Sequence, residues 1–164
     1  MQIGESFIGS GQNAAHINTV LGEREGPVGA AWANALAGPS AGYAPFVAIG
    51  RPGVAITPPT LFVNKAAIAG STHGDLTWGA AQAGVATGVA RALEDGTIDA
   101  SRCRELVLIA AVWVNPEADE AEAVYANNTE ATFQALRNGK AGFPTVDEFL
   151  PAGKDPWNPF YRSR

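Results

Sequence analysis

The feature that most constrains this fold is an unbroken apolar run over residues 106–114, Leu-Val-Leu-Ile-Ala-Ala-Val-Trp-Val. The run is far shorter than the ~20 residues that a membrane-spanning helix needs. A strand that is apolar at every position is typical of one that other elements cover on both faces. The run therefore predicts a buried central strand, around which the rest of the chain is arranged.

The segments on either side of this run alternate between strand and helix patterns. Strand patterns, which are apolar or β-branched runs bounded by Gly and Pro, occupy residues 3–8, 14–22, 45–49 and 60–68. Helix patterns occupy residues 28–36, 76–94 and 115–139. Asn115 can cap the last of these helices, and Pro116 suits its first turn. Residues 51–59 carry too much Pro and Gly for regular structure.

Interleaved strands and helices of this kind predict an α/β fold in two layers, an α+β arrangement in which helices cover a mixed sheet. A length of 164 residues suits one domain, so we expect a single domain over residues 1–164. Residues 151–164 are rich in Pro and aromatic residues. We expect them to form an extended tail.

The charge balance argues against a nucleic-acid partner. The chain has 16 acidic and 11 basic residues, a net charge of −5, and no basic cluster larger than a pair of arginines. A phosphate-backbone binder needs a basic footprint. Charged residues make up only 16% of the chain, which leaves room for subunit interfaces, and we expect a homo-oligomer. No leader or membrane segment is visible, so we expect a cytoplasmic protein with no membrane partner.

Two motifs favour ordinary structural roles. The single cysteine, Cys103, excludes an intrachain disulfide and a multi-cysteine metal site. It is expected at a helix end as a packing residue, although Arg102 and Arg104 could lower the pKa of a reactive thiol. The stretch from Gly9 to Ala14 matches the dinucleotide-binding fingerprint in letters, but a strand pattern follows it instead of the helix that would meet a pyrophosphate. We expect a loop there.

Four polar residues are candidates for chemistry. His16 and Asn18 lie two residues apart on an expected strand and so share a face. Imidazole suits proton transfer near neutral pH, although a lone strand histidine is also common as a structural residue. Lys65 ends an apolar strand, where it could meet a ligand or simply reach solvent. Gln82 lies early in a helix, with the same two alternatives.

The second histidine, His73, is expected in a turn. With two histidines and no carboxylates at ligand spacing around them, no metal site is expected.

Taken together, several stretches of the chain resemble the formaldehyde-activating enzyme family. They are Gly4-Glu5-Ser-Phe-Ile-Gly9-Ser-Gly11 with Ala15-His16-Ile17, Gly26-Pro27-Val28 with Ala33-Asn34-Ala35-Leu36, Pro59-Thr60-Leu-Phe-Val-Asn64-Lys65, Gly79-Ala-Ala-Gln82, Pro116-Glu117-Ala118, Tyr125 with Glu130-Ala131-Thr132, and Asn158-Pro159-Phe160. These stretches occur in the family's order and cover nearly the whole chain.

The resemblance implies a fold like domain 2 of ribosomal protein S5 and a homopentamer with active sites between neighbouring subunits. It implies that formaldehyde condenses with tetrahydromethanopterin, a co-substrate, to give 5,10-methylenetetrahydromethanopterin and water, with no metal and no tightly bound cofactor. His16 matches the family's general acid. The implied substrate-binding positions are Asn18, Val47, Lys65, Ala67 and Gln82.

This chain departs from the family pattern at three positions. Asn18 stands where the family has Asp, Ala67 where it has Thr, and Ala80 where it has Pro. An amide keeps an acceptor oxygen but loses the carboxylate charge. These departures leave open two alternatives to the enzyme: a paralogue that binds a reduced pterin or its one-carbon adduct as carrier or sensor, and a protein for another aldehyde or amine cofactor.

Overall fold

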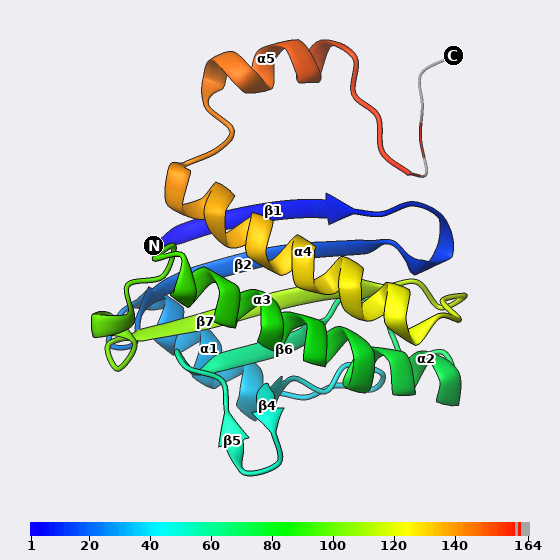
Figure 1. Ribbon diagram of the computed structural model, residues 1–164, viewed down its shortest axis with the longest axis horizontal. Helices are drawn as coiled ribbons and strands as arrows, with labels where there is room; N and C mark the ends of the chain where they lie inside the picture. The colour runs from blue at the N-terminus through cyan, green and yellow to red at the C-terminus, as the bar shows by residue number, and fades with distance from the viewer. Residues whose placement is uncertain (160, 162–164) are drawn as a thin grey trace.

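The expected central strand is β7 (Leu106–Val114), the middle strand of a five-stranded sheet in the order β1-β2-β7-β6-β3. The structure is a computed structural model that describes residues 1–159 and Tyr161. Phe160 of the Asn-Pro-Phe stretch and residues 162–164 at the end of the expected tail lie outside the described residues. Figure 1 shows β7 crossing the molecule beneath two long helices.

The sheet is mixed, as expected. β1 (Gln2–Ile8), β2 (Ala15–Glu23) and β7 pair antiparallel, whereas β6 (Thr60–Asn64) runs parallel to β7. At the far edge β3 (Phe46–Val47) pairs antiparallel with β6. The parallel pair is joined by a long helical crossover, which is the connection that parallel strands require.

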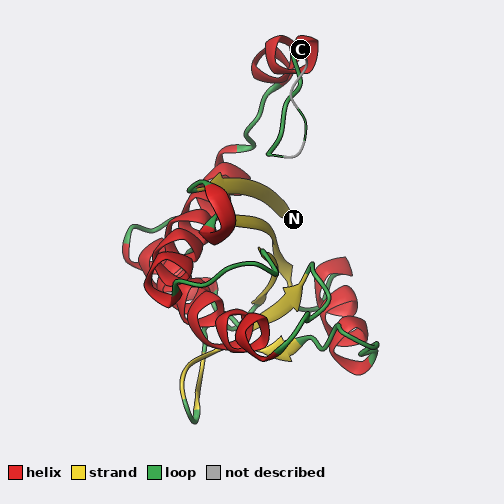
Figure 2. Ribbon diagram, turned by 90° about the vertical axis from the view of Figure 1, so that its right-hand side faces the viewer, coloured by secondary structure: helices red, strands yellow, loops and turns green. Residues whose placement is uncertain are grey.

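Helices α3 (Gln82–Glu94) and α4 (Ala121–Ala141) form the second layer, side by side on one face of the sheet (Figure 1). Between the layers lies an apolar core that includes Ile17, Leu108 and Val112 of the sheet. Helix α1 (Pro27–Ala37) packs on β2 and β7 from the other side of the sheet, as the turned view in Figure 2 shows. The two-layer α+β architecture predicted from the sequence is therefore confirmed.

Glycines set the close approach of α3 and α4. A Cβ atom added to Gly84 would lie 2.7 Å from the Tyr125 carbonyl oxygen, and one added to Gly88 would lie 2.7 Å from that of Thr129. Real Cβ atoms do not approach backbone oxygens this closely, so only Gly fits at these positions. The helical layer is held together by near contact of backbones rather than by large side chains.

Two expectations for the edge of the sheet are wrong. β6 ends at Asn64 rather than continuing to residue 68, because the Asn64 side chain donates hydrogen bonds to the carbonyls of Gly42 and Ala66 (both 2.8 Å) and turns the chain. Residues 51–59 are not wholly irregular, since β4 (Ile49–Arg51) and β5 (Val54–Ala55) form a hairpin. Its turn uses Gly53 at φ 81°, a conformation that Gly adopts at no steric cost.

The helix bounds also differ from the expected ones. α4 starts at Ala121 rather than near Asn115, and it ends at Ala141 with Gly142 in the left-handed conformation. The Asn115 side chain instead accepts from the Glu117 N–H (3.0 Å) and closes a turn. Asn13, in the short 3-10 segment η1 (Gly11–Asn13), accepts from two backbone N–H groups just ahead of α4. These long-range contacts hold the chain just ahead of the helix, and they leave no mark in local sequence.

The crossover helix begins earlier than residue 76. It comprises α2 (Ser71–Asp75), the π-helical segment η2 (Leu76–Ala81) and α3 in one continuous run. His73 therefore lies in a helix rather than in a turn, and it is buried. Its Nδ1 accepts the Ala69 N–H (3.1 Å), so its proton is on Nε2, which donates to the Val114 carbonyl (3.0 Å). These contacts give His73 a structural role.

The remaining elements lie outside the two layers. A 3-10 turn, η3 (Ala100–Arg102), precedes β7. Helix α5 (Val146–Lys154) stands away from the sheet (Figure 1) and starts in a capping box formed by Thr145 and Glu148. The helix runs past residue 151, where an extended tail was expected to begin. Among the described residues, no helix combines the length and apolar character that crossing a membrane requires.

The glycine contacts between α3 and α4 generate a stability prediction. Gly88→Ala should lower the free energy of unfolding by about 1–3 kcal/mol, because its Cβ would overlap backbone and the Thr132 side chain of α4. The matched control is Gly79→Ala in η2, where an added Cβ meets nothing within 4 Å. That change should be neutral or stabilise by roughly 0.5–1 kcal/mol. Urea unfolding followed by circular dichroism measures both, and equal effects would contradict the packing account.

Candidate active site

The strand register gathers polar side chains on the face of the sheet opposite α3 and α4. On β2, Ile17 is buried toward the helical layer, so its neighbours His16 and Asn18 point to the other face. In the β1 pairing, Glu5 lies directly opposite Asn18, and Phe7 lies opposite His16. Residues paired in this way share a face. We call this side of the sheet the open face.

Helix α1 covers one end of the open face. There α1 packs against Gly22, where an added Cβ would lie 2.6 Å from the Val28 side chain. At the other end Trp113 of β7 pairs with His16. The His16 side chain remains 37% exposed. The histidine is therefore accessible from outside the chain rather than packed in the core.

Lys65 joins the two predicted residues of β2. It follows β6 directly, and its backbone N–H donates to the Val112 carbonyl of β7 (2.8 Å). Its Nζ lies 3.1 Å from His16 Nδ1 and donates to Asn18 Oδ1 at 2.7 Å. Three of the site residues predicted from the sequence thus meet, although 47 or more positions separate Lys65 from the other two.

Glu5 contacts the opposite nitrogen of the same imidazole. Its Oε1 lies 3.1 Å from His16 Nε2. An ammonium group at Lys65 can only donate, so His16 Nδ1 must accept, and the ring proton is on Nε2, where it is donated to Glu5. The neighbours therefore select one neutral tautomer of His16. We call Lys65, His16 and Glu5 the relay set.

The electrostatic environment favours the neutral imidazole. Burial lowers the pKa of His16, the positive charge of Lys65 lowers it further, and the Glu5 carboxylate acts in the opposite direction. Burial also lowers the pKa of Lys65 to about 8, again against the effect of Glu5. Asn18 accepts a hydrogen bond from Lys65 but brings no negative charge. Lys65 therefore exchanges its proton much closer to neutral pH than an ordinary lysine would.

A cavity of about 720 Å³ lies against this cluster. Its walls come from β1, β2, β7 and the segment after α5, and its lining residues are Glu5, Phe7, His16, Trp113, Trp157, Asn158 and Pro159. Aromatic walls with a few polar groups suit a flat organic ligand. The described lining residues include His16 and Glu5, which form the Nε2 contact, but not Lys65, the partner of Nδ1. Nε2 is therefore the nitrogen nearer the cavity.

The other predicted site residues lie elsewhere in this chain. Val47 is in β3, two strands beyond β7, where it pairs with Leu61. Gln82 is buried at the start of α3, and its Oε1 accepts the Ile49 N–H at 2.9 Å. Ala67 is exposed in the loop after Lys65, where it lies against Gly42. Within one subunit, the structure does not bring Val47 or Gln82 to His16.

Sequence reasoning gave no role to Glu5, Phe7 and Trp113. A signal was present, because residues at alternate positions of β1 and β7 share a face with their partners on β2. Recognising it required the register between strands, which no local pattern supplies. Among the described residues, no group of three or more His, Cys, Asp or Glu side chains is placed to hold a metal ion.

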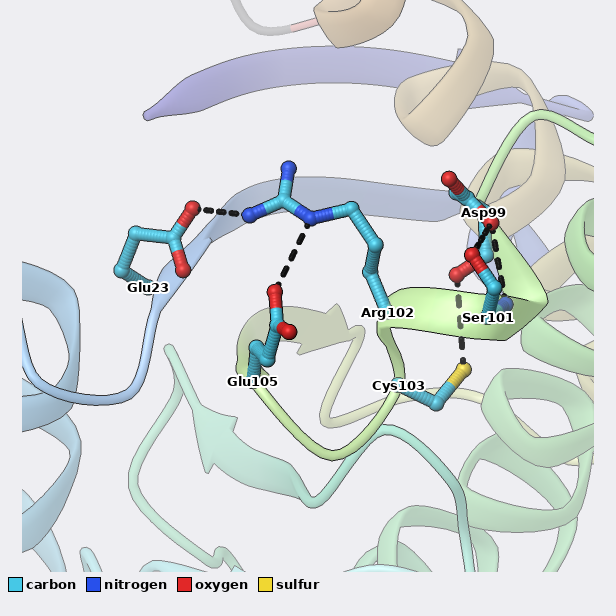
Figure 3. Close-up of polar contacts among 6 residues, drawn as sticks. All are labelled: Glu23, Asp99, Ser101, Arg102, Cys103 and Glu105. Atoms are coloured by element: carbon cyan, nitrogen blue, oxygen red, sulfur yellow. Dashed lines mark hydrogen bonds and ion pairs between the residues drawn. The ribbon is translucent and has the colours of Figure 1, made fainter.

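Cys103 takes a packing role, as the sequence favoured. The thiol is buried at the end of η3, and burial, with a smaller effect of Asp99, raises its pKa. Its only drawn contact in Figure 3 is with the Asp99 carbonyl (3.8 Å). Arg102 points away from the thiol toward Glu23 and Glu105, which hold η3 against the end of β2 (Figure 3). A thiol whose pKa is raised does not suit a nucleophile.

The comparisons with known proteins agree with the stretches noted in the sequence. The model of the formaldehyde-activating enzyme (Fae) family matches residues 3–161. The bifunctional enzyme Fae/Hps of Methanothrix thermoacetophila is 39% identical over 148 residues, which are 90% of this chain and 38% of that protein. The bifunctional enzyme Fae/Hps of Archaeoglobus fulgidus is 38% identical over 159 residues, 97% of this chain and 40% of that protein. The chain thus spans about two fifths of these relatives.

The lowered pKa of Lys65 predicts how stability changes with pH. Between about pH 8 and the ordinary lysine pKa near 10.5, the unfolded chain binds more protons at this position than the folded chain does. Stability contributed by Lys65 therefore rises with pH in that window. Relative to Lys65→Met, the wild-type protein should gain free energy of unfolding as the pH is raised from 7 to 10.

Urea unfolding of both proteins at several pH values measures this difference. Lys154→Met, which removes an exposed lysine of α5, is the matched control for Lys65→Met. A wild-type advantage that stays constant or shrinks between pH 7 and pH 10 would contradict the lowered pKa.

Proposed function

Because the chain belongs to the formaldehyde-activating enzyme family, we propose that it condenses formaldehyde with tetrahydromethanopterin to give 5,10-methylenetetrahydromethanopterin and water. The observation that carries the proposal is the placement of His16. Its Nε2 borders an aromatic-walled cavity, and its Nδ1 accepts from a lysine. Cavity, proton donor and cation are the parts that this condensation requires.

The difficult step of the reaction is the loss of a hydroxyl group from the first adduct. A secondary amine of the pterin adds to formaldehyde and forms a carbinolamine, whose hydroxide is a poor leaving group. His16 protonates that oxygen, water departs, and the second amine closes the ring. A positioned general acid supplies roughly 10²–10⁴-fold in rate, and holding both nitrogens near the carbon supplies more.

The walls of the cavity support the same role. Phe7, Trp113 and Trp157 offer flat apolar surfaces on which a pterin ring can stack. Lys65 and Asn18 present a donor and an amide beside His16, and we assign both to binding the pterin. A site that excludes water also keeps formaldehyde from hydration while the adduct forms.

We propose that Val47, Ala67 and Gln82 serve the same reaction from a neighbouring subunit. Val47 and Gln82 lie at the opposite edge of the sheet from β1, so one chain cannot place them beside its own His16. In a closed ring of copies, one edge of each subunit meets a different surface of the next. A homopentamer would in this way complete each pterin site from two chains.

A second candidate is a protein that binds the pterin or its one-carbon adduct without turnover. Asn18 and Ala67 favour it, because each lacks a polar or charged group that the family pattern has at that position. A hydroxyl hydrogen-bonded to a ligand contributes about 0.5–1.5 kcal/mol, so the loss at Ala67 is modest. The retained His16 and Lys65 favour the enzyme.

The proposed activity is tested by adding purified protein to formaldehyde and tetrahydromethanopterin. The wild-type protein should accelerate methylene-pterin formation over the spontaneous reaction, and His16→Ala should lose roughly 10²–10⁴-fold of that acceleration. His16→Gln, which keeps a polar side chain on β2, controls for loss of structure and should lose nearly as much.

Calorimetric titration with the pterin separates the two candidates. Binding without acceleration supports the carrier or sensor, and the double change Asn18→Asp with Ala67→Thr should then restore turnover. Full activity in His16→Ala would remove the acid role.

The shared site is tested by native mass spectrometry, which should show a particle of five chains. Mixing inactive His16→Ala with inactive Gln82→Ala by dissociation and reassembly should then restore part of the activity, because some interfaces would pair an intact His16 with an intact Gln82. A monomer with full activity would exclude a site built from two chains.

A further inference from the structure

The relay set does more than present one acid. Resting on the function proposed above, we propose that Lys65, His16 and Glu5 form a proton relay, in which Lys65 resupplies the proton that His16 delivers. In this relay Glu5 is a positioning residue that keeps the proton-bearing nitrogen of His16 turned toward the cavity. Lys65 thereby acquires a function in proton transfer beyond contact with the pterin.

The geometry places one partner at each nitrogen of the ring. Lys65 Nζ is 3.1 Å from Nδ1, and Glu5 Oε1 is 3.1 Å from Nε2. Glu5, the partner of Nε2, lines the cavity, whereas Lys65, the partner of Nδ1, is not among its described lining residues. A substrate oxygen in the cavity would therefore reach the nitrogen that already carries the proton. The Glu5 side chain is 60% exposed and can turn to solvent when that oxygen takes its place.

Dehydration of the carbinolamine then balances through two linked proton transfers. The C–O bond breaks, the Nε2 proton goes to the departing oxygen, and the oxygen leaves as water. The lone pair of the amine nitrogen forms the C=N bond of an iminium ion. His16 Nδ1 takes a proton from Lys65 Nζ, so the imidazole stays neutral in its other tautomer, and Lys65 becomes a neutral amine.

Ring closure returns the proton. The second amine of the pterin attacks the iminium carbon, and the new C–N bond leaves that nitrogen with one proton too many. This proton passes to His16 Nε2 while the Nδ1 proton returns to Lys65. All three residues regain their starting states, as a reaction whose only products are the methylene adduct and water requires.

The surroundings of Lys65 make it a suitable donor in this cycle. The titratable groups that face it are Glu5 on β1 and His16 on β2, whereas β7 presents Ala111 and Trp113 on this face. Asn18 holds the ammonium group at 2.7 Å without a charge of its own. A carboxylate at that position would raise the pKa of Lys65 and so shift the release of its proton to higher pH.

The test is the dependence of kcat on pH for variants that shift the relay in opposite directions. The wild-type kcat should fall as the pH rises through about 8, the pKa of Lys65. Asn18→Asp should move this fall to higher pH, and Glu5→Gln, which removes a nearby negative charge, should move it to lower pH.

Lys65→Arg keeps a donor and a positive charge but does not release its proton in this range. It should lose the fall near pH 8 and lower kcat roughly 10-fold to 100-fold, within the range for general acid catalysis. If Lys65 only bound the pterin, Lys65→Arg would instead raise KM and leave the pH profile of kcat unchanged. That result would overturn the relay while leaving the condensation itself intact.

A second readout does not depend on activity. Nitrogen-15 NMR of His16 in the free protein should show the proton on Nε2 at pH 7 and a change of tautomer populations as the pH passes about 8. In Lys65→Met the preference for Nε2 should weaken, and the step near pH 8 should disappear.

If the wild-type protein fails to accelerate the condensation, the proposed function falls. A tautomer that is independent of Lys65 overturns the relay in either case.

Discussion

The pairing register of β2 between β1 and β7 is the constraint on which the rest of this site depends. Because side chains alternate along a strand, a slip of one residue would turn His16 into the helical layer and Ile17 out to the cavity. The register is held from the buried side, where Ile17 and Val112 pack under α3 and α4. Apolar contacts of other residues, on the buried face of the sheet, thus set the positions of the polar residues on the open face.

The sequence was sufficient for the main elements but not for their ends. The unbroken apolar run predicted β7 correctly, because complete burial leaves a continuous pattern. The start of α4 was missed, since the chain just ahead of the helix is held by Asn13, more than 100 positions away. At the site, alternation on β2 placed His16 and Asn18 together, whereas Lys65 joined them only through family resemblance. The contribution of Glu5 required the three-dimensional register, which local sequence does not encode.

The chemistry of the open face reflects a balance between burial and charge. Lys65 is partly buried with an amide, not a carboxylate, as its closest partner. The cost of desolvation is therefore only partly offset, and the proton is held loosely. An ordinary exposed lysine would hold its proton too firmly to serve a histidine near neutral pH. By sequence alone, Asn18 in place of the family's Asp suggests lost function. The same replacement also changes the proton affinity of Lys65.

The glycine contacts between α3 and α4 have a consequence for how such a protein can evolve. Gly84 and Gly88 tie stability to the contact between α3 and α4, whose side chains are not among the described residues that line the cavity of the same chain. Replacements on the opposite surface, such as those at positions 18 and 67, can accumulate without repacking the interior. Selection can therefore explore new ligands on one side of the sheet while the other side preserves the scaffold, which is how one architecture comes to host diverged copies.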